Sequence, residues 1–133
     1  SVAFLLPVYY RSTAIIYPFS PKAYDPRMMF APNAELYGSG EDADRVITIA
    51  TSGEVGYYII NKYRLLQRYD IDPQDPYWEI KLTKEFNENL SVRENDKGAI
   101  EISTYDENPD TAALIVNDII NKTDEINKRP VLD

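Results

Sequence analysis

Apolar residues recur at intervals of three and four in the middle of the chain, and this period predicts amphipathic helices. A first helix is expected to begin at residues 39–42, whose sequence has the spacing of a capping box. Its apolar stripe consists of Ala43, Val46, Ile47 and Ala50. Ser52 is expected to cap a second helix, because a serine hydroxyl accepts hydrogen bonds from the free amides of a first turn. The stripe of that helix runs through Val55, Tyr58, Ile59, Lys62, Tyr63 and Leu66, and Lys62 is expected to extend its ammonium group to water.

Two further helices are predicted nearer the C-terminus. Asp75 and Pro76 have the residue types of an N-cap followed by a first-turn proline. The apolar residues of this shorter helix are Trp78, Leu82 and Phe86. Asn108 and Pro109 are expected to begin the last helix in the same way. Its long and regular stripe consists of Ala112, Ile115, Val116, Ile119, Ile120, Thr123 and Ile126.

Alternating polarity predicts three strands. Residues 8–17 are rich in β-branched and aromatic side chains and are bounded by Pro7 and Pro18. Residues 90–94 and 99–105 flank a four-residue turn that ends in glycine, which is typical of a hairpin. The first strand directs Thr13, Ile15 and Tyr17 to one face and Ala14 and Ile16 to the other, and the hairpin buries Leu90, Val92, Ile100 and Ile102 on one face. Because an isolated hairpin is marginal in water, the first strand is expected to pair with it.

These elements predict an α+β fold, in which a small sheet is covered by about four helices. The sheet consists of the N-terminal strand plus the hairpin in the C-terminal half. The chain has 133 residues, and neither a repeat nor a linker divides it, so residues 1–133 are expected to form a single domain. Prolines and a glycine make residues 18–38 a loop, whose Met28, Met29 and Phe30 either anchor it on the core or contact a partner.

The first eight residues are apolar but far fewer than the roughly 20 that span a bilayer. They are either the outer end of a membrane helix or the beginning of a buried strand. No signal peptide is recognisable, because neither a basic n-region nor a cleavage site accompanies the run.

The amino-acid composition limits which partners and which catalytic or metal sites the chain can have. Lysine and arginine total 14 and aspartate and glutamate 22, so the net charge of −8 argues against a nucleic-acid partner. Without cysteine or histidine, the chain has no disulfide, no cysteine nucleophile, no Ser-His-Asp triad and none of the usual zinc ligands. Carboxylates are the remaining acid/base groups, and several cluster at Asp70, Asp72, Asp75 and Glu79. We interpret these as turn and cap residues; the alternatives are a hydrolytic pair or oxygen ligands for calcium.

Three stretches of the chain carry a family resemblance. The first is FLLPVYYRSTA at residues 4–14, and the second runs from EDADRV at 41–46 to LLQRY at 65–69. The third is the hairpin at 90–103, followed by Asp106, Pro109, Ala112, Ala113 and Asn117. In this order they resemble the extracytoplasmic domain of chain-length determinant (Wzz-type) proteins, the polysaccharide co-polymerases of bacterial inner membranes.

The resemblance implies a non-enzymatic domain without a cofactor. It implies a periplasm-facing position between two membrane helices, so that the chain is expected to be a fragment of an inner-membrane protein. It further implies a homo-oligomer that works with a polysaccharide polymerase or export machinery. Such an assembly regulates the chain length or export of a surface polysaccharide, such as the O-antigen of lipopolysaccharide, a capsule or an exopolysaccharide. The long helical arm that often follows the last helix in this family is not seen in residues 130–133.

Candidate contact residues come from the unusually frequent tyrosines, 11 in all, and from neighbouring arginines. Aromatic faces stack on sugar rings, but they also pack helices and subunit interfaces. Four residues are the candidates for contact with a glycan or a neighbouring subunit: Tyr57, Arg64, Arg68 and Tyr69. The alternative function is a small carbohydrate-binding or carbohydrate-active domain that uses the acidic and aromatic cluster at residues 69–79.

Overall fold

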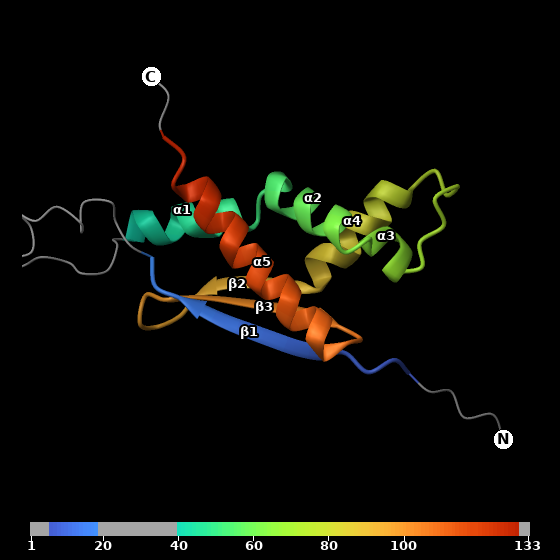
Figure 1. Ribbon diagram of the computed structural model, residues 1–133, viewed down its shortest axis with the longest axis horizontal. Coiled ribbons are helices and arrows are strands. Elements are labelled where there is room, and N and C mark those ends of the chain that lie inside the picture. Colours follow the sequence, from blue (N-terminus) through green and yellow to red (C-terminus); the bar gives the residue numbers. More distant parts are fainter. Residues whose placement is uncertain (1–5, 19–39, 131–133) are drawn as a thin grey trace, which may run out of the picture.

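Three antiparallel strands form the sheet, and the helices lie on one side of it (Figure 1). The structure, a computed structural model, describes residues 6–18 and 40–130. Its elements are β1 (Tyr10–Ile16), α1 (Gly40–Ala50), α2 (Gly53–Lys62), α3 (Leu65–Arg68), α4 (Trp78–Glu88), β2 (Leu90–Glu94), β3 (Ile100–Asp106) and α5 (Pro109–Asn127). The predicted α+β class is therefore confirmed. Most of the predicted loop, including Met28, Met29 and Phe30, and the start of the predicted capping box lie outside the described residues.

The strand order is β1-β3-β2, so the first strand pairs with the hairpin as predicted. The register places Ala14 opposite Ile102, and Ile102 opposite Val92. Because side chains alternate along a strand, these residues form one row on the face that the helices cover. The neighbouring row, on the opposite face, consists of Thr13, Ser103 and Ser91. The sheet thus has an apolar inner face and a mainly polar outer face.

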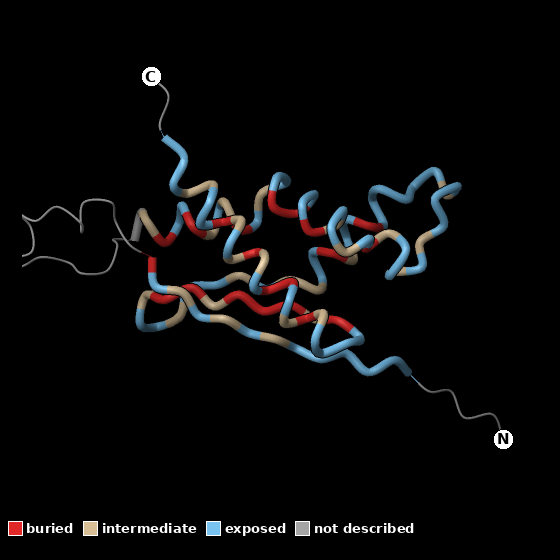
Figure 2. The backbone as a smooth tube through the Cα atoms, in the orientation of Figure 1, coloured by how far each residue is buried: buried red, intermediate tan, exposed pale blue. Residues whose placement is uncertain are grey.

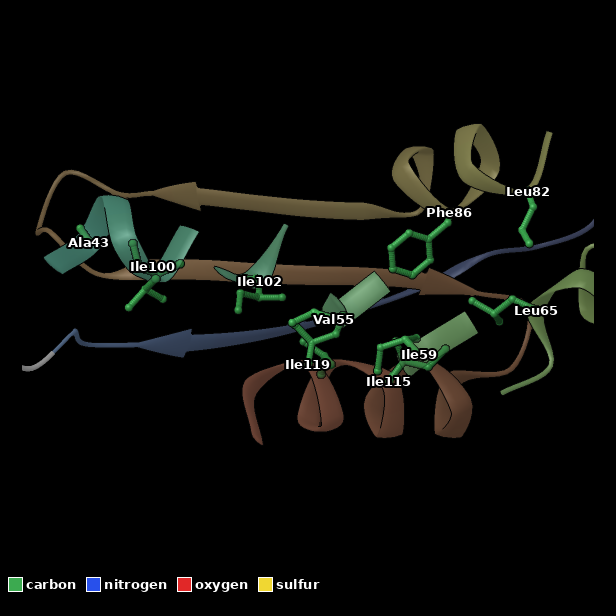
Figure 3. Packing of buried hydrophobic residues seen from close by; sticks show 13 residues of the cluster. Ala43, Val55, Ile59, Leu65, Leu82, Phe86, Ile100, Ile102, Ile115 and Ile119 are labelled. Atoms are coloured by element: carbon green, nitrogen blue, oxygen red, sulfur yellow. The ribbon is translucent and has the colours of Figure 1, made fainter. Parts of the chain in front are cut away.

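The core lies between the inner face of the sheet and the helices. Helix α5 packs across β1 and β3, while α1 contacts β2 and α5. Figure 2 shows the buried positions concentrated along this contact, and Figure 3 shows the side chains that fill it. The largest fully buried side chains are Val55, Ile59, Leu65, Ile100, Ile102 and Ile119. The stripe predicted for the last helix is therefore the face that covers the sheet.

Local hydrogen bonds explain where the predicted elements begin and turn. The Ser52 hydroxyl accepts from the Val55 amide at 3.4 Å, and the Asn108 side chain accepts from the first-turn amides of α5. In the hairpin, the Asn95 side chain accepts from the amides of Lys97 and Ala99. Gly98 has φ 79°, a conformation that side chains with a Cβ rarely adopt. The predicted caps of α2 and α5 and the predicted four-residue turn are confirmed.

The second helix is shorter than predicted. It ends at Lys62, because Arg64 adopts the left-handed conformation with φ 51° and redirects the chain into α3. This break shifts the phase of the apolar stripe, so Leu65 rather than Leu66 is fully buried. The third predicted helix also begins later, at Trp78, whose side chain is partly exposed.

Lys62 is exposed, as predicted, and its ammonium group also pairs with a carboxylate of α5. Its Nζ lies 2.8 Å from Asp118 Oδ2 on α5, and Asp118 also accepts a hydrogen bond from the Tyr63 hydroxyl. Burial and the hydrogen bond to Asp118 raise the pKa of Tyr63 to about 12. A lysine of α5, Lys122, lies with its Nζ 4.8 Å from the centre of the Tyr58 ring. These contacts tie α2 to α5 along their solvent-facing margin.

Replacing a core residue of α5 should cost far more stability than replacing an exposed residue of the same helix. Ile119→Ala removes a fully buried side chain between α5 and the sheet, so we expect a loss of about 3 kcal/mol in the free energy of unfolding. Leu114 is 55% exposed, and Leu114→Ala should change stability by less than about 0.5 kcal/mol. Urea denaturation measures both, and equal losses would contradict this account of the core.

Candidate functional site

A groove of about 490 Å³ lies between the segment that enters β1 and helix α4. Its lining combines an aromatic ring, an aliphatic side chain, an amide and charged groups of both signs. The residues are Tyr9, Ile71, Lys81, Lys84, Glu85, Glu88 and Asn89. Tyr9 is far from the other lining residues in the sequence, so the fold must bring them together.

The sheet topology explains this convergence. Tyr9 immediately precedes β1, whose first residue, Tyr10, lies opposite Asp106 at the end of β3. At the same end of β3, the Tyr105 amide donates to the carbonyl oxygen of Asn89 at 3.0 Å. Because Asn89 joins α4 to β2, this bond fixes the last turn of α4 beside the beginning of β1.

An ion pair attaches α3 to the same end of the sheet. The Arg68 guanidinium contacts Asp106 Oδ2, and the Asp106 side chain is 7% exposed. The same oxygen accepts the Asn108 amide at 2.9 Å, next to the first turn of α5. A carboxylate with so little exposure needs partners for its charge, and these two donors supply them. The contact therefore holds α3, β3 and α5 at one corner.

Negative charge gathers around the tyrosines of this corner. Burial raises the pKa of Tyr69 to about 12; the charges of Glu85 and Asp106 act in the same direction, whereas a hydrogen bond with Asn89 opposes them. Burial, followed by the charges of Glu107, Glu85 and Asp106, raises the pKa of Tyr9. The phenols of Tyr9 and Tyr69 are therefore held in the neutral, hydrogen-bonding form.

Glu85 shares this environment. Burial, together with the charges of Glu88 and Glu107, raises the pKa of Glu85 above its usual range. The lysines of the groove partly offset the acids, since Lys81 pairs with Asp75 and the Lys84 Nζ lies 4.0 Å from Glu88. The groove thus offers the neutral phenol of Tyr9, the amide of Asn89 and paired charges, which are groups suited to hydrogen bonding and stacking with a polyhydroxylated ligand.

The acidic cluster at residues 69–79 forms turns beside the groove. Asp72 accepts from the Gln74 amide at 2.9 Å, and Asp75 accepts from the Tyr77 amide at 2.8 Å while it also pairs with Lys81. Their interpretation as turn residues is confirmed, whereas the predicted cap at Asp75 is wrong, because α4 begins after Tyr77 and its first turn has no side-chain cap. Across residues 6–18 and 40–130, the structure places no group of three or more acidic side chains where they could hold a metal ion.

The four candidate contact residues separate in the structure. Arg68 and Tyr69 lie at the corner where α3 meets β3 and α5, and both have intramolecular partners, but they are not among the residues that line the groove. Tyr57 is 62% exposed on α2, and Arg64 is exposed at the junction between α2 and α3; neither lines the groove. Sequence reasoning did not select Tyr9, Glu85 or Asn89, although Tyr9 lies within the first stretch of the family resemblance.

Comparisons with family models, curated proteins and solved structures each find no match to this chain. In the part of the chain that the structure describes, no helix combines the length and the apolar character needed to cross a bilayer.

Removing the arginine of the corner should destabilise the protein. Arg68→Ala leaves the nearly buried Asp106 carboxylate without its cationic partner, so we expect a loss of roughly 2 kcal/mol in the free energy of unfolding. Arg93→Ala is the matched control, because it breaks an ion pair with Glu101 in which Arg93 is 72% exposed. Arg93→Ala should lower the free energy of unfolding by clearly less than Arg68→Ala does. Chemical denaturation measures the stability of both variants, and an equal loss of stability would contradict the structural role of Arg68.

The raised pKa of Tyr69 predicts a late step in alkaline titration. Since its pKa in the folded state is about 12 rather than 10, the stability from keeping this phenol neutral is fully present below pH 10 and is lost as the pH rises towards 12. Ultraviolet absorbance of phenolate should show a late phase, shared with Tyr63, that Tyr69→Phe reduces. A Tyr69→Phe profile with an intact late phase would refute the assignment.

Proposed function

We propose that this chain is the periplasm-facing domain of a polysaccharide co-polymerase of the chain-length determinant type. In this proposal the domain is non-enzymatic and belongs to a bacterial inner-membrane protein. It assembles with copies of itself and works with a polysaccharide polymerase or export machinery. It acts by offering surfaces to the growing or exported polysaccharide and thereby influences its chain length or its export.

One observation carries the proposal: the three stretches that resemble the family converge at one corner of the fold. Tyr9 belongs to the first stretch and lines the groove. Arg68 and Tyr69 end the second stretch, and Arg68 pairs with Asp106 of the third. The spacing of residues around Asp106, Asn108 and Ala112 also has a structural basis, since the buried Thr104 hydroxyl donates to the Ala112 carbonyl oxygen at 2.7 Å. Separate motifs that build one site support a shared origin more strongly than each motif does alone.

The chemistry of the groove supports contact with sugar. Tyr9 is 44% exposed, so part of its ring is available for stacking. Asn89 also lines the groove, and its hydrogen bond with Tyr69 opposes the rise in the pKa of that phenol. The same groove favours the second candidate function, a carbohydrate-binding domain, because Ile71 of the 69–79 region contributes to its wall.

A pair of tyrosines that flank β1 provides a matched test in cells. In the full-length protein, Tyr9→Ala should alter the length distribution of the surface polysaccharide, because it removes the exposed ring of the groove. Tyr17→Ala removes a ring of similar exposure, 49% against 44%, at the other end of the strand and should leave the distribution unchanged. Gel analysis of the extracted polysaccharide measures both, with protein abundance determined in parallel.

The same cells test the broader proposal. Deleting the gene should change the length or the amount of a surface polysaccharide, and the full-length protein should be oligomeric by native mass measurement. A deletion without effect on surface polysaccharide, or a strictly monomeric full-length protein, would contradict the proposed function. Glycan binding without any change in chain length or export would favour the carbohydrate-binding alternative.

A further inference from the structure

In the part of the chain that the structure describes, one edge of β1 is not paired with another strand. β1 is an outer strand of the sheet and pairs with β3 on one side. Within residues 6–18 and 40–130, no strand pairs with its other side. Thr13 is exposed, and Ile15 is 52% exposed. Figure 1 shows β1 at the margin of the fold, in front of β3.

Two hydrogen bonds of the hairpin establish which backbone groups of β1 point outward. The Tyr105 amide donates to Asn89, and the Asn95 amide donates to Ala99, so the odd-numbered residues of β3 bond towards β2. In an antiparallel ladder, alternate residues direct both N–H and C=O to the same side. The even-numbered residues of β3 therefore bond to β1, and their partners there include Ser12 and Ala14. It follows that the outward-pointing backbone groups of β1 belong to Arg11, Thr13 and Ile15.

This edge lacks the features that usually prevent pairing with another chain. In natural proteins, prolines, bulges, charged side chains or short length protect edge strands from pairing with another chain. The register of β1 runs without interruption over its seven residues, which include one charged side chain, Arg11, and no proline. The other edge strand, β2, has five residues and ends in Arg93 and Glu94. The β1 edge is thus the better template for an added strand.

We propose that β1 pairs antiparallel with β1 of a second copy about a two-fold axis at Thr13, which joins the two sheets into one. In this register Thr13 exchanges backbone hydrogen bonds with Thr13 of the second copy. Arg11 does the same with Ile15 of the second copy, and Ile15 with Arg11. The backbone groups of all three outward-pointing residues are then hydrogen-bonded. A shift that moves the axis to Arg11 would instead place like charges opposite each other.

The side chains of β1 are self-complementary in this register. On the helix-covered side, Tyr10 lies opposite Ile16 of the second copy, an aromatic and β-branched pair of the kind that stabilises sheets. Tyr10 is 46% exposed in the single chain and would become less exposed in the dimer. Because odd-numbered residues lie opposite odd-numbered residues, the polar outer face of one sheet continues into that of the other. A two-fold contact of this kind closes at the dimer. This dimer names one specific contact for the self-assembly in the proposed function, but it is argued from the backbone geometry and the side chains of β1 and does not rest on that function.

Proline substitution tests the contact, because the outward and inward residues of β1 must respond differently. The 133-residue chain should sediment as a dimer within a range of about 5 to about 500 μM. Thr13→Pro removes an outward N–H without removing a bond to β3, so it should raise the dissociation constant at least about tenfold with unchanged circular dichroism. Thr13→Val keeps the N–H and should remain dimeric. Ala14→Pro removes a bond to β3 and should lower the melting temperature instead.

A charge exchange provides a second test that does not depend on proline. Ile15→Lys places an ammonium group opposite Arg11 of the second copy and should weaken the dimer, while Arg11→Glu combined with Ile15→Lys should restore it. A wild-type chain that is monomeric at the highest concentration, assemblies larger than a dimer, or a charge exchange without rescue would overturn the proposal. Such a failure would leave the proposed function standing, because the polysaccharide phenotype tests that separately.

Discussion

The sheet has one apolar face, and burial of that face beneath α5 is the interaction on which the positions of the other elements depend. β3 is the central strand, and every one of its residues is buried or partly buried. Its Ile100 and Ile102 pack in the same cluster as Ile115 and Ile119 of α5. Since α1 and α2 contact α5, their positions follow from where α5 lies on the sheet. Because the helices cover one side of the sheet, its mainly polar outer face stays uncovered, and so does the edge of β1 that no described strand pairs with.

Charged groups then fix the positions of α2 and α3, which apolar packing alone does not determine. Lys62 and Tyr63 share Asp118 across the α2–α5 contact, and Arg68 reaches Asp106 from the short α3. A four-residue helix such as α3 has little stability of its own, so its place depends on such contacts. The groove depends on both kinds of contact. Pairing in the sheet brings Tyr9 and Asn89 to one end, and the ion pair holds α3 beside them.

Local features were predictable from the sequence, whereas features that depend on distant residues were not. The stripe of α5, the caps Ser52 and Asn108, and the hairpin turn at Gly98 are encoded within a few residues. The left-handed conformation of Arg64 has no comparable signal, because arginine rarely adopts it, and the break it causes was missed. The partner of Lys62 lies far along the chain on α5. The groove could not be predicted either, since it requires the spatial order of strands that place Tyr9 near α4.

The pairing of β1 with β3 also sets the order in which the protein can fold. The Thr13 and Ser103 hydroxyls that meet at 2.7 Å are separated by 90 positions in the chain. Closing so long a loop costs more entropy than closing the hairpin, so β2, β3 and α5 can associate before β1 joins them. During synthesis β1 leaves the ribosome well before β3, its partner strand. Among β1, β2 and β3, the strand that is translated first is therefore the last to be protected, and nascent chains on one messenger are exposed to premature association through it.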